Sequence, residues 1–344
     1  MWTYIIRKLF GVPISLLIIS LAIFGLSALL TPEERVMAYI KDPLQVRSPM
    51  VIENLVQKYR LRDPWPLQYG RWVREVLRGN LGFSTSAQEP VLSALRRRFP
   101  ATVELVFFSF PLICIGGIIL GVVSAIYRNT VIDYLSRIFA ISCWSMPSFV
   151  VALFILMIFY GWLKVFLPGR LSPWAIDVLQ KAQIINFTGF ILIDALLNNR
   201  MDIFLDALKH MAMPSMTLVL VNWAPIARLT RSAALEIARQ DFVTAARARG
   251  LPERRVVFGY ILRNALIPIL TFGGMLAGWL LTGVVITETV FNYDGLGRFG
   301  AMVAMGLDFA GILGFALFCG FVIILINIGV DICYTIIDPR IMLD

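Results

Sequence analysis

Six stretches of this sequence contain no Asp, Glu, Lys or Arg, and each is 18 to 26 residues long. A buried helix of a soluble protein usually contains about 10 to 14 apolar residues, whereas crossing the hydrocarbon core of a bilayer takes about 20. The sequence therefore predicts an all-α polytopic membrane protein with six transmembrane helices. The six stretches are residues 9–32, 105–127, 138–163, 210–227, 264–287 and 309–330. The shortest, residues 210–227, is expected to draw on flanking residues to reach full length.

Composition favours a membrane protein over a soluble one. Charged residues make up 15% of the chain, compared with about 25% in an ordinary globular protein. A net charge of +9 is compatible with basic loops at a membrane surface, so no nucleic-acid partner is expected. The four cysteines lie in apolar runs without C-x-x-C spacing, which favours buried side chains over metal ligands or disulfides.

The orientation of the spans follows from the short connections between them. The first apolar stretch exceeds the 7 to 15 or so residues of a cleavable signal peptide, so residues 1–32 are expected to form a retained first span. The link 128–137 carries two basic residues, whereas the link 288–308 carries only Arg298. Since short cytoplasmic loops are enriched in Lys and Arg, the chain is predicted to have both ends in the cytoplasm (N-in, C-in).

A large external loop, residues 33–100, is predicted after the first span. Residues 51–79 show helical spacing on both sides of Pro64-Trp65-Pro66, and Gly79 ends the pattern. This predicts folded helices near the outer surface. They either pack on the spans as a lid or offer a contact surface to an external partner, and the spacing leaves both interpretations open.

The cytoplasmic segment 228–264 is predicted to form a helix, a turn and a second helix. Apolar residues recur at three- and four-residue spacing, which predicts one helix face. Gly250 supplies a C-terminal stop, and Pro252 suits the first turn of a following helix. The small residues Ala245, Ala246 and Gly250 would let this elbow lie in a groove of another protein; an ordinary basic loop is the alternative. The residues assigned to the one face are Leu235, Ala238, Phe242 and Ala245.

At this point the chain resembles a known family. "TAARARG" followed by "LRNALIP" resembles the EAA loop of ABC importer permeases, and the spacing from Gly250 to Pro268 is similar to that of the dipeptide/oligopeptide/nickel branch. Thr244 stands where the wider superfamily has a glutamate, and Asp294 where proline is usual before Gly-Leu-Gly. Further matching stretches, in order, are "YIIRKL", "DPWPLQYGRWVREVLRGNLGFS", "RFPATVEL", "SMPSF", "HMAMPS", "RLTRSAALE", "TETVFNYDGLGR" and "IDPR".

The resemblance implies a type I ABC importer permease, the first-permease or B-type subunit, in a prokaryotic cytoplasmic (inner) membrane. Such a subunit works with a second homologous permease, as a heterodimer, with two cytoplasmic ABC ATPases and with an extracytoplasmic solute-binding protein. It binds no cofactor itself, because ATP and Mg are used by the ATPases. The implied five-helix core is residues 101–340. The implied ATPase-coupling residues are Asp241, Thr244, Ala245, Ala246, Arg249, Gly250, Leu251 and Pro252.

Candidate pathway residues combine helix irregularity with small or polar side chains, because irregular backbone at membrane depth is tolerated mainly beside protein or a cavity. Tight helix packing explains the glycines equally well. Glu288 is added because an ionisable group near membrane depth usually turns inward. The candidates are Trp144, Pro147, Asn222, Trp223, Gly274, Gly278 and Glu288.

No catalytic motif accompanies these features. The sequence contains no G-x-x-x-x-G-K-[ST] loop, so the chain is predicted not to be an enzyme, and no metal site is expected. His210 is expected to cap or pack at the start of a span. Peptides are the expected cargo, with oligosaccharides or metal chelates as the alternative within the same family. A transporter or channel that works without an ATPase, or a membrane enzyme, remains a rival from another class.

Overall fold

The computed structural model describes residues 2–26, 31–36, 39, 49–181, 185–281 and 284–337, and within these ranges it describes side chains from residue 13 to residue 329, except at Leu26 and Pro49. The "DPR" of the C-terminal motif and the side chains of the basic residues Arg7 and Lys8 lie outside what is described. The chain separates into two compact units. Unit 1 contains Met1–Thr102, Leu281–Thr289 and Asp294–Asp344, and unit 2 contains Val103–Leu280 and Val290–Tyr293.

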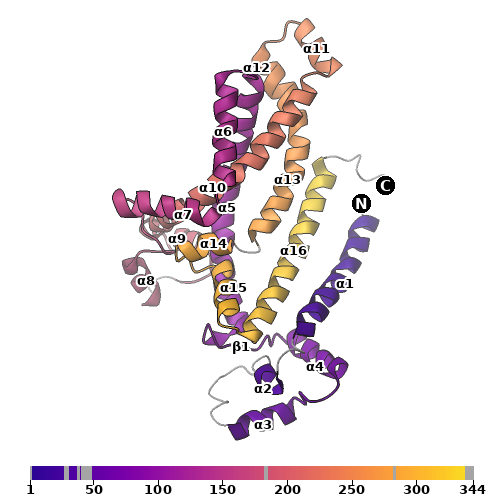
Figure 1. The fold of residues 1–344 in the computed structure, drawn as a ribbon, viewed down its shortest axis with the longest axis vertical. Coiled ribbons are helices and arrows are strands. Elements are labelled where there is room, and N and C mark those ends of the chain that lie inside the picture. The colour runs from indigo at the N-terminus through magenta and orange to yellow at the C-terminus, as the bar shows by residue number, and fades with distance from the viewer. Residues whose placement is uncertain are drawn as a thin grey trace. The chain divides into compact units, whose positions relative to one another are not determined.

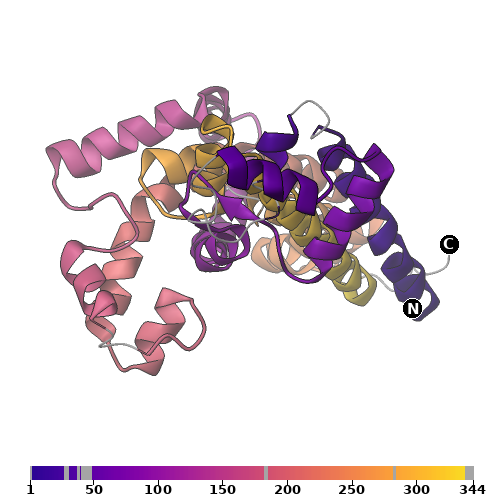
Figure 2. The same cartoon turned by 90° about the horizontal axis from the view of Figure 1, so that it is seen from below.

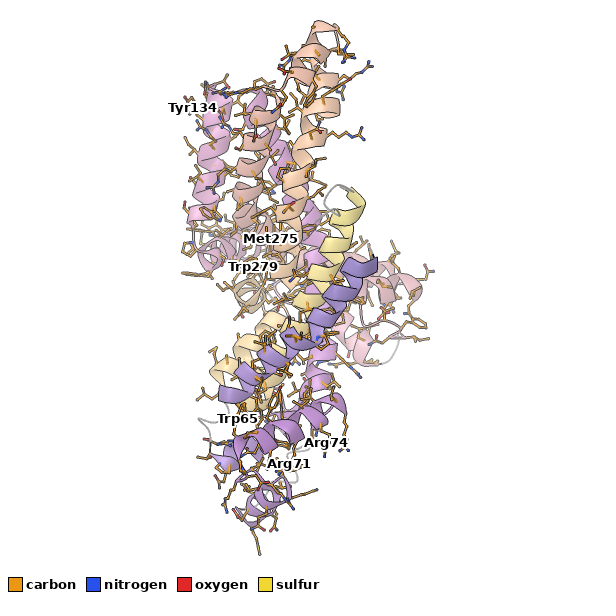
Figure 3. The ribbon with its side chains drawn as sticks, turned by 90° about the vertical axis from the view of Figure 1, so that its right-hand side faces the viewer. Trp65, Arg71, Arg74, Tyr134, Met275 and Trp279 are labelled. Atoms are coloured by element: carbon orange, nitrogen blue, oxygen red, sulfur yellow. The ribbon has the colours of Figure 1, made fainter. Side chains whose placement is uncertain are left out.

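Unit 1 is built on two apolar helices, α1 (Trp2–Leu26) and α16 (Phe309–Ile337), which lie side by side in Figures 1 and 2. The short helix α2 (Pro32–Arg35) follows α1, and α3 (Pro49–Lys58) and α4 (Trp65–Leu77) are the helices predicted around the Pro-Trp-Pro break. Phe24 of α1 packs against Trp65, Tyr69 and Trp72 of α4, with ring centroids 5.1 to 5.6 Å apart. Figure 3 shows Trp65, Arg71 and Arg74 on α4.

A small antiparallel hairpin follows α4 in unit 1. β1 (Phe83–Ser84) pairs with β2 (Glu89–Pro90), so that Phe83 lies opposite Pro90. Asp308, just before α16, accepts hydrogen bonds from the Ser84 hydroxyl and from the backbone N–H of Ser86, the latter at 3.1 Å. The hairpin is therefore tied to the start of α16. Unit 1 is completed by the first turns of α5 (Val91–Ile126), most of α14 (Val285–Val290) and α15 (Leu296–Met305).

Unit 2 contains most of α5 and the long helices that run beside it in Figure 1. α10 (Met201–Ile237) contacts α6 (Val131–Ser145), α7 (Ser148–Leu156) and α9 (Ile191–Leu197). The other elements are η4 (Met157–Trp162, π-helical), α8 (Pro173–Gln180), α11 (Asp241–Ala248), α12 (Glu253–Arg255), η5 (Val256–Leu262, π-helical) and α13 (Arg263–Leu281).

Close contact between α5 and α10 depends on glycine. An added Cβ at Gly117 would lie 2.7 Å from the Ile226 side chain, and one at Gly121 would lie 2.6 Å from the Ala227 carbonyl oxygen. These two glycines are four residues apart, the small-xxx-small spacing that lets helix backbones approach in a membrane. An added Cβ at the adjacent Gly116 would likewise collide with the Trp223 ring. The sequence prediction did not single out these glycines.

Four of the described helices are long and apolar enough to cross a membrane, or five if a bent pair counts as one span. The predicted span 210–227 is the centre of the much longer α10, as expected. α1 overlaps the predicted first span, but residues 27–30 and the side chains before residue 13 are not described. The count of six spans and the N-in, C-in orientation remain predictions.

The predicted third span, residues 138–163, bends sharply at Pro147, which was among the candidates chosen for helix irregularity. α6 ends at Ser145 and α7 begins at Ser148, with an angle of 100° between them. The cause lies at Pro147, which lacks a backbone N–H and pushes the preceding residue out of the helical region. Met146 accordingly has extended dihedral angles, φ −79° and ψ 136°.

Replacing Gly121 with leucine should separate α5 from α10. Overpacking a close contact costs about 1 to 3 kcal/mol, so the temperature of unfolding in detergent should fall by several degrees. Gly161→Ala is the matched control, because a Cβ there meets nothing within 4 Å. If Gly121→Leu unfolded at the wild-type temperature, the close contact would not contribute to stability.

Candidate functional site

The predicted elbow consists of α11 and α12, joined by a turn at residues 249–252. Figure 1 shows both at one end of unit 2, beyond the ends of α10 and α13. The helix-turn-helix prediction is confirmed. One detail was wrong: residues 235–245 do not form one helix, because α10 ends at Ile237 and α11 begins only at Asp241. Leu235 and Ala238 therefore do not share a helix face with Phe242 and Ala245.

Gly250 ends α11 through its backbone conformation. Its φ is +75°, in the left-handed region that favours glycine. Its N–H donates to the Arg247 carbonyl at 2.9 Å, and the Leu251 N–H donates to the Ala246 carbonyl at 3.4 Å, which together form a Schellman motif. An added Cβ at Gly250 would meet nothing within 4 Å in this chain. The glycine is therefore required here for the turn and not for packing within the subunit.

The inner side of α11 anchors the elbow to the helices that continue into the membrane. Val243 and Ala246 are fully buried against Val256, Ile261 and Ala234. Across the turn, the Arg247 guanidinium donates to both carboxylate oxygens of Glu253, at 2.7 and 3.2 Å. Since bidentate pairs fix geometry, this clamp holds α11 and α12 at a set angle. The sequence prediction did not include the clamp.

The outer side of the elbow is open and slim. Phe242 is 43% exposed, an apolar ring that the predicted site list omitted although "DFVTAARA" contains it. Among the predicted coupling residues, Ala246 is buried and Leu251 is half-buried. The others are exposed: Asp241, Thr244, Ala245, Arg249, Gly250 and Pro252.

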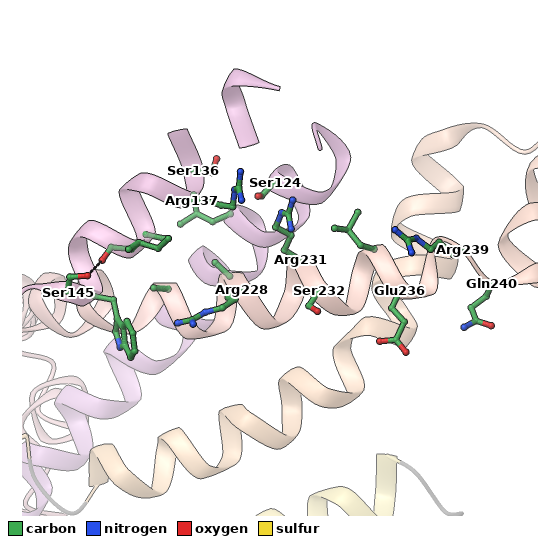
Figure 4. A pocket seen from close by; sticks show the side chains of 17 residues that line it. Ser124, Ser136, Arg137, Ser145, Arg228, Arg231, Ser232, Glu236, Arg239 and Gln240 are labelled. Atoms are coloured by element: carbon green, nitrogen blue, oxygen red, sulfur yellow. Dashed lines mark hydrogen bonds between the residues drawn. The ribbon is translucent and has the colours of Figure 1, made fainter. Parts of the chain in front are cut away.

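Beside the elbow, a cavity of about 870 Å³ lies between α5, α6 and α10. Figure 4 shows Arg228, Ser232 and Glu236 following one another along α10, while Ser136, Arg137 and Ser145 come from α6. Of the predicted pathway residues, Trp144 lines this cavity, and the carbon at the centre of the Arg228 guanidinium lies 5.1 Å from the centroid of its ring.

A buried ion-pair cluster centred on Asp133 supports one wall of the cavity. Arg231 of α10 donates to both carboxylate oxygens, at 2.9 and 3.1 Å. Arg137 lies 3.2 Å away, and the Ser124 hydroxyl and the Asn129 N–H also donate to this carboxylate. The cluster joins α5, α6 and α10, and it compensates the burial of the carboxylate.

The other predicted pathway residues are bound to local partners and do not meet at one place. The Asn222 amide donates to the Leu218 carbonyl one turn earlier, at 2.7 Å, and the Trp223 indole N–H donates to the Leu112 carbonyl of α5 at 3.2 Å. Pro147 forms the bend after α6. Gly278 is buried within α13 and Gly274 is half-buried, on a helix whose exposed Met275 and Trp279 are labelled in Figure 3.

Glu288 belongs to unit 1, in the short helix α14 outside the four long spans. Its carboxyl group is fully buried, accepts the Thr102 hydroxyl at 2.7 Å and accepts the Arg298 N–H at 3.0 Å. Burial raises the pKa of Glu288 from 4.5 to about 7, although these hydrogen bonds oppose the shift. Thr102 also accepts the Leu296 N–H. The group therefore ties α14, α15 and the start of α5 together.

Comparison with known proteins gives the family. Residues 117–343 match the family described as binding-protein-dependent transport system inner membrane component. The chain belongs to this family. Like its relatives, it is a permease component of a bacterial inner membrane.

The relatives of this permease include proteins named for dipeptide transport. The chain is 42% identical over 296 residues to the probable D,D-dipeptide transport system permease protein DdpB of Escherichia coli K12, covering 86% of this chain and 85% of that one. It is 37% identical over 309 residues to the di/tripeptide permease DppB of Pseudomonas aeruginosa UCBPP-PA14, with coverage of 87% and 89%. The fold resembles that of the MetNI methionine ABC transporter, with a TM-score of 0.51 at 14% identity, covering 72% of this chain and 97% of that one.

The family match covers both the elbow and the cavity. Residues 117–343 include the elbow, its Gly250 turn and every residue that lines the cavity, whereas helices α3 and α4 lie outside the match. Periodicity and turn residues identified the elbow. No local pattern could have identified the cavity, because its residues come together only when α6 packs on α10.

Glu288→Gln should change how stability depends on pH. The folded protein holds the Glu288 proton up to about pH 7, whereas an unfolded chain releases it near pH 4.5, so wild-type stability falls as pH rises between these values. The loss is at most about 3 kcal/mol. Glu288→Gln has no such proton. The unfolding temperature of the variant minus that of the wild type should therefore increase from pH 5 to pH 8.

The control for this experiment is Asp177→Asn, at an exposed carboxylate on α8. Its unfolding temperature should follow the wild type across the same pH range. Parallel curves for wild type and Glu288→Gln would show that Glu288 does not titrate in this range.

Proposed function

We propose that this permease forms half of the translocation pathway of an ATP-driven importer of short peptides, with six spans and both ends in the cytoplasm. A second homologous permease would complete the pathway. Two cytoplasmic ATPases would use ATP and Mg, and an extracytoplasmic binding protein would deliver the cargo. The proposal is supported by the family membership and by relatives named for dipeptide and di/tripeptide transport.

The observation that carries the proposal is the geometry of the elbow. Its outer side presents small side chains, one exposed phenylalanine and a glycine turn. Its inner side is buried on α10 and the start of the α13 segment. The small side chains on the outer side would let the elbow lie in a cleft of an ATPase. The buried inner side would pass the movement of that ATPase on to the membrane helices. For such coupling, the ATPase must bind two states of the permease with different affinity, because equal affinity shifts nothing.

Rival functions have less support from the described residues. A membrane enzyme would need an accessible catalytic cluster. His210, Ser172 and Asp206 do lie together, but all three are buried, and the Ser172 hydroxyl donates to Asp206 at 2.6 Å. The His210 Nδ1 lies 3.2 Å from the Gly169 carbonyl oxygen. This arrangement suits a packing role that holds the segment after η4 on α10. Oligosaccharides and metal chelates remain alternative cargoes.

Two substitutions of Gly250 separate bulk from backbone strain. Any side chain at φ +75° costs about 1 to 2 kcal/mol, so Gly250→Ala and Gly250→Trp carry a similar strain, but only tryptophan adds bulk to the outer side. Gly250→Ala should keep most of the ATPase co-purification and peptide uptake, whereas Gly250→Trp should lose both at least tenfold. Equal, near-wild-type behaviour of both variants would contradict docking at this surface.

Thiol labelling in whole cells and inverted vesicles tests the orientation. In a background without the native cysteines, Ala248→Cys on α11 should react with a membrane-impermeant maleimide only in inverted vesicles. Leu77→Cys, at a position 83% exposed at the end of α4, should react only from outside. Labelling of Ala248→Cys from outside the cell would overturn both the topology and the proposed docking.

A further inference from the structure

The cavity between α6 and α10 has no role in the coupling elbow, yet it has the size of a ligand site. Its volume of about 870 Å³ lies within the range of about 300 to 1,000 Å³ that is typical of small-molecule sites. It follows α10 from Ala224 to Glu236 and continues to Gln240 beyond the end of that helix; the helical part alone is about 18 Å long at 1.5 Å per residue. A short peptide, at about 3.3 to 3.6 Å per residue, fits within that length.

The charge of the cavity is positive. Four arginines line it: Arg137, Arg228, Arg231 and Arg239. Asp133 forms ion pairs with Arg137 and Arg231. Among the residues that line the cavity, Glu236 is the one acidic residue. Within the described part of the chain, Arg228 forms no ion pair with a carboxylate. An anion is therefore the ligand that this cavity favours.

Arg228 is held ready for such a ligand. Its guanidinium lies over the ring of Trp144, 5.1 Å from the centroid, and stacking on an aromatic face orients the planar group while leaving N–H donors free at its edge. That edge matches the two oxygens of a carboxylate. Aliphatic side chains line the same cavity, among them Ala140, Ile141 and Ala224. The combination provides an anion receptor with apolar side chains among its neighbours.

We propose that this cavity is a station on the translocation pathway that binds the free C-terminal carboxylate of the transported peptide. Arg228 receives the carboxylate and Trp144 positions Arg228. This rests on the proposed function, and it narrows the cargo, because a neutral oligosaccharide offers no group for Arg228. Ser136, Ser145, Ser232 and Gln240 continue along the wall and can hydrogen-bond peptide amides.

An anionic phospholipid is the competing occupant, since its phosphate could reach the same guanidinium. Polar side chains recur over the whole length of the cavity, so an acyl chain would find no continuous apolar wall. The observations therefore favour a peptide, and the lipid becomes an outcome of the test.

A thiol placed in the cavity reports binding directly. The complete transporter, with Ser232→Cys as its only cysteine in the permease, is placed in phosphatidylcholine nanodiscs and reacted with the anionic 2-sulfonatoethyl methanethiosulfonate. Millimolar dialanine should slow the reaction at least fivefold, and dialanine amide, which lacks the carboxylate, should not. Adding Arg228→Gln should abolish the protection, and Arg228→Lys should restore part of it.

Three outcomes would overturn the proposal. One is equal protection by dialanine and its amide, and another is full protection in the Arg228→Gln variant. The third is loss of Ser232→Cys reactivity when phosphatidylglycerol replaces part of the nanodisc lipid without peptide, which would identify a lipid as the occupant.

Uptake into proteoliposomes separates this inference from the proposed function. With saturating binding protein, Arg228→Gln should lower the initial rate of dialanine uptake about tenfold, the loss expected for a charge-assisted hydrogen bond, while ATPase co-purification is unchanged. Arg128→Gln, at an exposed arginine outside the cavity, is the charge-matched control and should match the wild type. Absence of dialanine uptake by the wild type would refute peptide import itself, whereas equal uptake by Arg228→Gln would refute only the carboxylate site.

Discussion

The close contact between α5 and α10 is the constraint on which the positions of the cavity and of the elbow depend. Gly117 and Gly121 allow the two backbones to meet, with no space for a side chain between them. α10 carries one wall of the cavity and ends next to the elbow. In a bilayer, helices gain little from hydrophobic association, and close backbone packing and buried hydrogen bonds take its place. The Asp133 cluster, which joins α5, α6 and α10, is the polar counterpart of the glycine contact.

The elbow is rigid where it meets the membrane helices and open where a partner would bind. The Schellman turn at Gly250 and the Arg247–Glu253 clamp set the angle between α11 and α12, and Val243 and Ala246 bury one side against the following π-helical segment. A unit fixed in this way suits the proposed role of passing a displacement on to the attached helices. The cavity lies along α10, the helix that leads into the elbow, so movement of α10 would also change the surroundings of Arg228.

Much of this arrangement could be predicted from the sequence. Gly250 is required for a left-handed turn, Pro64-Trp65-Pro66 separates two helices, and long uncharged runs mark spans; each of these depends on residues that are neighbours in the chain. Pro147 was chosen for helix irregularity, but the sequence could not give the 100° bend there, because a proline can also be accommodated in a helix, as Pro214 and Pro225 are in α10. Whether proline bends a helix depends on what packs beside it.

The sequence by itself determined that the chain enters a membrane, where its helical elbow lies and that the elbow turns at a glycine, since these follow from local hydrophobicity and backbone geometry. Only the tertiary structure decided which side of the elbow is buried, that Glu288 is enclosed by Thr102 and the backbone of α15, and that Arg228 lies over Trp144 beside a cavity. Those features join residues from different helices, and their burial and electrostatics arise only when the helices pack.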